Sequence, residues 1–312
     1  MTASPVLSVQ RASCRWGSRT ALDQVSFQIP AGQIFALVGP NGAGKTTLIR
    51  AVAGRVPFHD GAIEVAGAAA GTPAARAALG LVPQTIALYP FQTARENLET
   101  FGRLSGVPAG AIGPVVRRAL ERVDLADSAD RITGQLSGGM QRRLNIAAGL
   151  LHDARLLLLD EPTVGVDLAS REYVHDLLRS LRADGVGILL TTHDLDQAME
   201  LADVVGVLTQ GRLVAQGTPT DLIRQTFGGD RELLLSLTAP PTDTARGLLE
   251  GHGLRMISDG RRWTGRLHGG LTDAGALQGG LEATGAVIEE IRIREPSLRS
   301  VFFQLTGEEL LP

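Results

Sequence analysis

The stretch "GPNGAGKTT", residues 39–47, decides the fold of this 312-residue chain. It follows the apolar run 33–38 and leads into the helix-forming segment 45–54, the context in which a glycine-rich loop holds phosphates. Backbone N–H groups would wrap the phosphates, Lys45 would neutralise the β and γ oxygens, and Thr46 would offer its hydroxyl to Mg²⁺. The flanking strand and helix argue against a glycine-rich turn that matches by chance. We therefore predict an α/β fold with a nucleotide cradle.

Two carboxylates follow the apolar run "LLLL" at 156–159. That run predicts a central strand, so Asp160 would stand at its end and hold Mg²⁺, usually through water. Glu161 projects one step further and could polarise an attacking water as a general base. A strand end with two solvated acids is the alternative, and the phosphate loop upstream disfavours it.

Two more polar residues end predicted strands. Gln84 could reach Mg²⁺ with its amide oxygen, and His193 could touch the γ-phosphate and sense its loss. A lone Gln or His is more often an ordinary satisfied polar group. Their positions relative to the other motifs favour the functional interpretation.

The stretch "QLSGGMQRR", residues 135–143, predicts a second phosphate-seeking helix start. Ser137 is a good N-cap, and Gly138 and Gly139 remove side chains where something must approach the backbone. A bare helix N-terminus of this kind attracts anions. A simple helix cap is the alternative to phosphate binding. Both use the same N–H groups, so both interpretations can be true.

Composition limits the remaining possibilities. The net charge is -3, from 30 basic and 33 acidic residues that are well mixed, which argues against nucleic acid as the main partner. Cys14 is the single cysteine and fits a reducing compartment. The N-terminus has no apolar core of signal-peptide length, and no segment approaches the ~18 apolar residues of a membrane span. We expect a cytoplasmic chain, or one held at a membrane by another protein.

Hydrophobic patterns divide the chain into two predicted domains, 5–228 and 229–312. The first combines antiparallel strands within 5–30, a parallel-sheet core, and a helical insertion at about 90–152 that opens with Thr93 and Glu96 in capping-box spacing. The second has the order βαββαβ, which suggests a small α+β ferredoxin-like domain. We expect its last helix, 297–306, to close that domain's own core with Leu298, Val301, Phe302 and Leu305.

With these motifs in place, the chain resembles an ATP-binding cassette (ABC) ATPase, a P-loop NTPase that drives ABC transporters. The resemblance covers residues 5 to about 225 and holds every motif in family order: the phosphate loop, Gln84, "LSGGMQ", "LLLLDEP", Asp167 in "VGVD", and His193. It implies that Trp16 stacks on adenine, although a half-buried core Trp is the alternative. It also implies a head-to-tail homodimer in which Ser137 of one chain clasps the ATP of the other.

The resemblance therefore implies ATP and Mg²⁺ as cofactors and three groups of residues. Glu161, His193 and Lys45 would be catalytic, and Thr46, Gln84 and Asp160 would hold the metal. The nucleotide would contact Trp16, Gly39, Pro40, Asn41, Gly42, Ala43, Gly44, Lys45, Thr46, Thr47, Gln84, Ser137, Gly138, Gly139, Gln141 and Asp167.

The segments 88–107 and 295–310 resemble ATPases that drive multidrug, antibiotic, lipid and polysaccharide exporters. The resemblance thus implies an export motor bound to a separate transmembrane permease at the inner face of the cell membrane. Phe91-Gln92 departs from many relatives, at a place where the insertion should contact that permease. Alternatives are a non-transport ABC ATPase acting on ribosomes or DNA, an importer motor, and a GTPase. This chain lacks the N-K-x-D stretch with which a GTPase reads guanine, which disfavours the last alternative.

Overall fold

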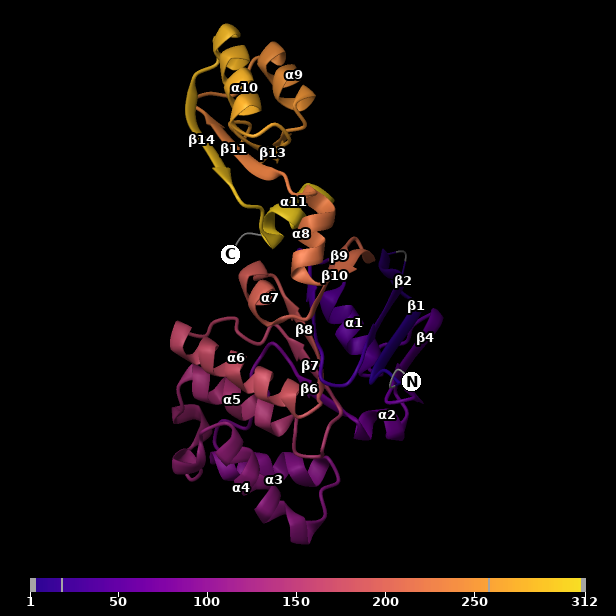
Figure 1. Cartoon of the computed structure of the whole chain (residues 1–312). Helices are drawn as coiled ribbons and strands as arrows, with labels where there is room; N and C mark the ends of the chain where they lie inside the picture. Colours follow the sequence, from indigo (N-terminus) through magenta and orange to yellow (C-terminus); the bar gives the residue numbers. More distant parts are fainter. Residues whose placement is uncertain (1–3, 18, 258, 310–312) are drawn as a thin grey trace. The chain divides into compact units, whose positions relative to one another are not determined.

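The structure, a computed structural model, describes residues 4–17, 19–257 and 259–309. It divides into two compact units, coloured along the chain in Figure 1. The first runs through His193 and resumes from Glu200 to Leu213. The second comprises Asp194–Met199 and the chain from Val214 onward. The predicted boundary at residue 228 stays a prediction.

A six-stranded sheet forms the centre of the first unit, in the order β10-β9-β3-β8-β7-β6. Strands β9, β3, β8, β7 and β6 run parallel, as the sequence predicts. Every residue of β3 and β7 is buried, which explains their unbroken apolar runs. The strands are β3 (Ile34–Val38), β6 (Leu79–Val82), β7 (Leu156–Asp160), β8 (Gly187–Thr192), β9 (Val204–Thr209) and β10 (Arg212–Gly217).

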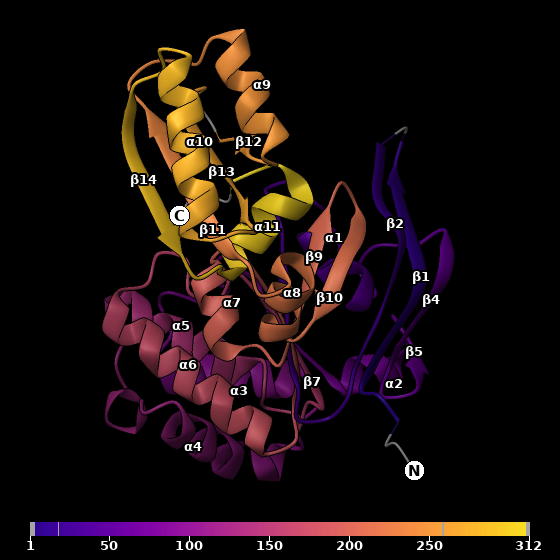
Figure 2. The ribbon, with the colours of Figure 1, turned by 45° about the horizontal axis from the view of Figure 1, so that its top comes forward.

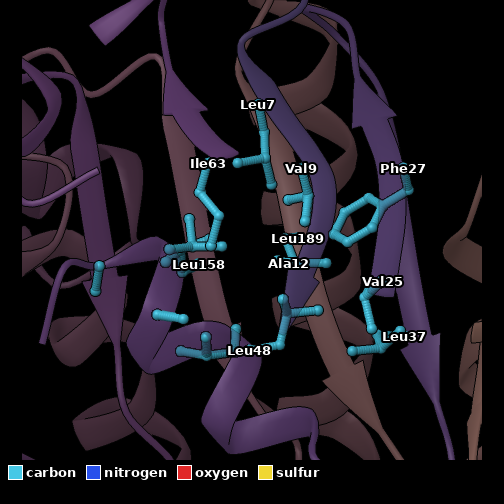
Figure 3. Close-up of a cluster of buried hydrophobic side chains, with 14 of the residues drawn as sticks. Leu7, Val9, Ala12, Val25, Phe27, Leu37, Leu48, Ile63, Leu158 and Leu189 are labelled. Atoms are coloured by element: carbon cyan, nitrogen blue, oxygen red, sulfur yellow. The ribbon is translucent and has the colours of Figure 1, made fainter. Parts of the chain in front are cut away.

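A second sheet is antiparallel and has the order β2-β1-β4-β5. Its strands are β1 (Leu7–Trp16), β2 (Arg19–Ile29), β4 (Asp60–Val65) and β5 (Ala68–Ala69). Figure 3 shows Leu7, Val9, Phe27 and Ile63 of this sheet in one buried cluster with Leu48, Leu158 and Leu189. Because Leu48 lies on the helix that follows the phosphate loop, this cluster fixes the loop against both sheets.

The predicted insertion is helical. Figure 1 shows α3 and α4 together at one end of the unit, and both contact α5. Thr93 and Glu96 form the expected capping box, in which each residue's N–H donates to the other's side chain. The helices of this unit and its border are α1 (Lys45–Val52), α2 (Pro73–Ala77), α3 (Ala94–Leu104), α4 (Ile112–Arg122), α5 (Gly138–Ala148), α6 (Leu168–Ala183) and α7 (Leu195–Leu201), with 3₁₀ turns at 109–111, 126–128 and 133–135.

The C-terminal unit contains the predicted βαββαβ order. Its elements are β11 (Arg231–Leu237), α9 (Asp243–Gly251), β12 (Arg255–Met256), β13 (Arg262–Leu267), α10 (Leu271–Ala283) and β14 (Ile288–Arg294). The strands pair antiparallel in the order β12-β13-β11-β14. Figures 1 and 2 show α9 and α10 side by side, and their apolar residues share a core with Trp263.

The last helix, α11 (Leu298–Thr306), departs from the prediction. It packs against α8 (Pro219–Phe227), outside the core cluster of the ferredoxin-like fold. Leu305 is 40% exposed, and Phe303 is buried in its stead. The first turn of α11 is nevertheless tied to the ferredoxin-like sheet, because the buried carboxylate of Glu232 on β11 accepts a hydrogen bond from Ser300 Oγ at 2.7 Å.

Membrane-spanning helices are not found among the described residues, since none of their helices is both long and apolar enough to cross a bilayer.

Candidate functional site

The phosphate loop lies between the end of β3 and the start of α1, and backbone contacts require its glycines. A Cβ at Gly39 would lie 2.2 Å from the Leu208 carbonyl oxygen, and one at Gly44 would lie 2.5 Å from that of Ala21. Gly42 and Gly44 also have φ angles of 83° and 111°, which side chains disfavour. The loop backbone is therefore held in one shape by its neighbours.

Lys45 opens α1 and points its amine into the loop. Its Nζ donates to the Gly39 carbonyl at 2.6 Å and to the Pro40 carbonyl at 3.2 Å. Burial lowers the pKa of Lys45, although the nearby charges of Glu161 and Asp160 act in the opposite direction. Lys45 is also the only lysine in the chain. A charged amine in this desolvated position needs an anion close by.

Asp160 ends β7 and is 7% exposed. Its Oδ1 accepts hydrogen bonds from Thr191 Oγ1 at 2.6 Å and from Thr46 Oγ1 at 3.4 Å. The structure thus brings the loop threonine and the strand-end carboxylate together, as the sequence predicts. Hydroxyl and carboxylate oxygens are ligands that Mg²⁺ prefers.

Glu161 has a left-handed backbone, with a φ of 48°. Such a conformation costs about 1–3 kcal/mol for a residue with a side chain, and it recurs at functional sites. Its N–H donates to the Thr191 carbonyl at 3.1 Å and lies 3.2 Å from Thr191 Oγ1. Thr191, which is completely buried, therefore contacts both acidic residues.

Gln84 and His193 converge on Glu161. Gln84 Nε2 donates to Glu161 Oε2 at 3.2 Å, and His193 Nδ1 lies 3.3 Å from the same oxygen. The two residues follow β6 and β8, which flank β7 in the sheet. Parallel strands end at one edge, so side chains distant in sequence meet there.

A cavity of about 670 Å³, a size typical of small-molecule sites, opens beside Lys45, Glu161 and His193. The predicted Gly39, Ala43 and Asp160 are not among its lining residues. Trp16 is 53% exposed and belongs to the lining, and its stacking on adenine stays a prediction. The cavity is lined by Trp16, Arg19, Ala21, Pro40, Asn41, Gly42, Gly44, Lys45, Thr46, Thr47, Gln84, Glu161, Val164 and His193.

Sequence reasoning missed Arg19, Ala21 and Val164 in this lining. Arg19 begins β2 directly after the turn from β1, and a Cβ on Gly42 would lie 3.5 Å from its Nη2. The only signal was its place three residues after Trp16. An arginine in a hairpin is otherwise an ordinary surface residue.

The predicted second helix start is present but lies elsewhere. Ser137 caps α5, because its Oγ accepts from the Met140 N–H at 3.2 Å. Gly138 faces open space, whereas a Cβ on Gly139 would lie 2.0 Å from Ser170 Oγ. Ser170 on α6 of the same chain is thus what approaches the backbone at Gly139, and the predicted contact of Gly138 and Gly139 with nucleotide stays a prediction.

Asp167 belongs with this second group. It caps α6 by accepting from the Ser170 N–H at 3.0 Å and from Ser170 Oγ at 2.9 Å, and these bonds lower its pKa. Gln141 Nε2 donates to the Leu136 carbonyl at 2.9 Å. Ser137, Gly138, Gly139, Gln141 and Asp167 are absent from the cavity lining found among the described residues. The predicted nucleotide contacts therefore fall into two separate groups.

Family comparison agrees with this site. A family model described as "ABC transporter" matches residues 22–164. Over 309 residues the chain is 37% identical to the daunorubicin resistance ATP-binding protein DrrA3 of Streptomyces coeruleorubidus, with 98% of each chain covered. It is 34% identical to the linearmycin resistance ATP-binding protein LnrL of Bacillus subtilis, covering 98% of this chain and 99% of the relative.

Solved structures agree with it as well. An ATP-binding subunit of an ABC transporter superposes with a TM-score of 0.64 at 29% identity, over 70% of this chain and 92% of that one. The cbiO1 subunit from Clostridium perfringens gives a TM-score of 0.65 at 26% identity, over 72% and 94%.

Proposed function

The chain belongs to the ABC transporter family as an ATP-binding, ATP-hydrolysing subunit, and from this premise we propose that it is the motor of an exporter. The observation that carries the proposal is the convergence of Gln84 and His193 on the strained Glu161, beside the phosphate loop. This arrangement presents a carboxylate, with its position fixed, to a water next to a bound γ-phosphate.

Hydrolysis then follows from this chain's own groups. Glu161 accepts a proton from water while the water oxygen bonds to the γ-phosphorus and the bond to the ADP oxygen breaks. Lys45 neutralises charge on the phosphate oxygens, and the α1 N-terminus adds backbone N–H donors. His193, 3.3 Å from Glu161, orients that carboxylate and contacts the γ-phosphate.

Mg²⁺ fits the oxygens gathered at the end of β7. Thr46 Oγ1 and the Asp160 carboxylate, 3.4 Å apart, would hold it together with the Gln84 amide oxygen. When bound, the ion would neutralise the phosphates and orient them. The same three side chains provide an all-oxygen donor set without sulfur or imidazole.

The second group of residues serves a second copy of the chain. Ser137 and the open face of Gly138 present helix N–H groups toward solvent, so they are accessible to a phosphate held by another molecule. In a head-to-tail homodimer each phosphate loop faces the other chain's Ser137, and Asp167 lies beside that contact. ATP then closes the dimer and hydrolysis releases it.

A separate permease supplies the membrane pathway. The insertion exposes apolar side chains just after Gln84: Phe91 is 90% exposed and Tyr89 is 47% exposed. Such side chains suit contact with another protein. We place the chain at the inner face of the cell membrane through this permease. The relatives' names, which mention daunorubicin resistance, linearmycin resistance and Nod factor export, favour export over import or an action on ribosomes. The exported substrate would be a drug, antibiotic, lipid or glycan.

Replacing Glu161 by Gln tests the proposal. Glu161→Gln keeps the shape of the site but removes the proton acceptor, so turnover should fall by roughly 10²- to 10⁴-fold while ATP still binds. Light scattering should then detect a dimer at saturating ATP. Glu172→Gln, an exposed acid on α6, is the control and should hydrolyse ATP normally. Wild-type turnover in Glu161→Gln would contradict the assigned role.

A further inference from the structure

Strand β14 is an exposed edge of the ferredoxin-like sheet. It pairs with β11, from Glu232 opposite Arg294 to Leu237 opposite Ile288, and stands last in the strand order of the described residues. Figures 1 and 2 both show it along the rim of the sheet. Its seven residues contain no proline, and four of them are charged: Glu289, Glu290, Arg292 and Arg294. Charged side chains on an edge disfavour pairing with an unmatched strand, so a strand with complementary charges is the partner that fits.

The two faces of β14 carry different side chains. Ile291 and Ile293 pack against the apolar core of the unit. Glu290 and Arg292 alternate with them and therefore stand on the other face, 50% and 61% exposed. These two side chains form an ion pair at 2.6 Å within the strand.

Arg294, on the same face, is held by an ion pair with the buried Glu232 of this unit at 2.6 Å, and Glu289 falls where the register with β11 shifts. Glu290 and Arg292 are therefore the acidic and basic groups that the regular part of the edge offers to a second strand, two residues apart.

We propose that β14 pairs antiparallel with β14 of a second copy of this chain, centred on Ile291. In this register Glu290 stands opposite Arg292 of the second copy, and Arg292 stands opposite its Glu290. Two opposite-charge pairs form at once, and directly opposed charges of this kind stabilise antiparallel strands. The contact is two-fold symmetric, so each copy uses the same residues.

Other registers are disfavoured by the same residues. Centring the pair on Glu290 would oppose Glu290 with itself. Centring it on Arg292 would oppose two arginines and would set Glu290 against Arg294, which is already paired with Glu232. A register offset by one residue would set Glu290 against Ile291, which belongs to the apolar face. The charges of Glu290 and Arg292 therefore favour the pairing centred on Ile291, in which two copies form a continuous sheet of eight strands.

Mixed cysteine variants test the register directly. Cys14 is the only native cysteine and is buried, so introduced thiols dominate the chemistry. Under mild oxidation without nucleotide, full-length Glu290→Cys mixed with Arg292→Cys should yield several-fold more disulfide-linked dimer than either variant alone. Identical positions are two residues out of register, beyond the roughly 7 Å Cα separation that a disulfide tolerates.

Matched variants decide the interpretation. Glu250→Cys, exposed on α9, mixed with Arg292→Cys should give only background cross-linking. In sedimentation velocity, Glu290→Arg and Arg292→Glu should each weaken dimerisation, and the double variant should restore it. The pairing would be overturned if the single variants cross-linked as much as their mixture, or if the double variant did not recover dimerisation. Either result counts when the variants show native circular dichroism. Because these assays contain no ATP, their failure would leave the proposed motor function untouched.

Discussion

Thr191 supports both acidic residues of the site, so replacing it by valine should damage stability and turnover together. Its Oγ1 donates to Asp160 at 2.6 Å and lies 3.2 Å from the Glu161 N–H. A hydrogen bond to a charged group contributes about 1.5–3 kcal/mol, and Asp160 is too buried for water to replace it easily. Thr191→Val keeps the side-chain volume, so cavity formation adds little.

The expected loss is about 1.5–3 kcal/mol in the free energy of unfolding. For a unit of this size that lowers Tm by roughly 3–12 °C, at about 2–4 °C for each kcal/mol. Because the Asp160 carboxylate loses a donor and the Glu161 N–H loses one of its two acceptors, kcat should fall at least about tenfold, which corresponds to ~1.4 kcal/mol, with a smaller change in KM.

Thermal unfolding and phosphate release measure these effects. Thr191→Ser is the control, since it keeps the hydroxyl and loses only a methyl group, worth about 0.8 kcal/mol of burial. It should retain most of the activity that Thr191→Val loses. Wild-type Tm and kcat in Thr191→Val would refute the view that this hydroxyl holds the Asp160 carboxylate and the Glu161 backbone in place.

Three further outcomes follow from the site. An amine reagent at pH 9 should modify Lys45 faster than an ordinary lysine, because a lowered pKa leaves more of the neutral amine below pH 10.5. MgATP should protect Lys45 from the reagent, and labelling that ATP leaves unchanged would place the nucleotide elsewhere. Iodide should quench the fluorescence of the exposed Trp16 and spare that of the buried Trp263, and ATP should reduce that quenching. Trp16→Ala should weaken ATP binding by ~1–3 kcal/mol, and unaltered affinity would exclude stacking. Gly139→Ala should destabilise the fold by about 1–3 kcal/mol through its clash with Ser170, whereas Gly138→Ala should fold normally, and equal melting curves would contradict that packing.

Much of this site could be predicted because its residues follow local rules. Short sequence patterns predict the geometry of a glycine-rich turn between strand and helix, and of acids at the end of an apolar strand. Parallel strands then bring Gln84 and His193 to the same edge as Glu161. Arg19 and Thr191 could not be found this way, because their roles depend on contacts with residues far along the chain.

The position of α11 shows the same limit in the fold. Its apolar stripe predicts that one face is buried, and most of that face is. The sequence does not say what covers it. A buried carboxylate 68 residues away in sequence, on Glu232 of β11, accepts a hydrogen bond from Ser300, and the helix also packs against α8. Likewise, the local pattern around Gly139 suggests a ligand, but it does not show that Ser170 of the same chain also lies close to this glycine.

Complementation between two inactive variants tests the shared site most directly. Lys45→Ala lacks the amine of the phosphate loop, and Ser137→Ala lacks the clasp hydroxyl. Thr242→Ala, which removes the comparable cap of α9, controls for the loss of helix capping. Random pairing of the two chains leaves one intact site in each mixed dimer. The mixture should therefore recover up to about a quarter of wild-type ATP hydrolysis. Activity no greater than that of the separate variants would show that each chain hydrolyses ATP alone.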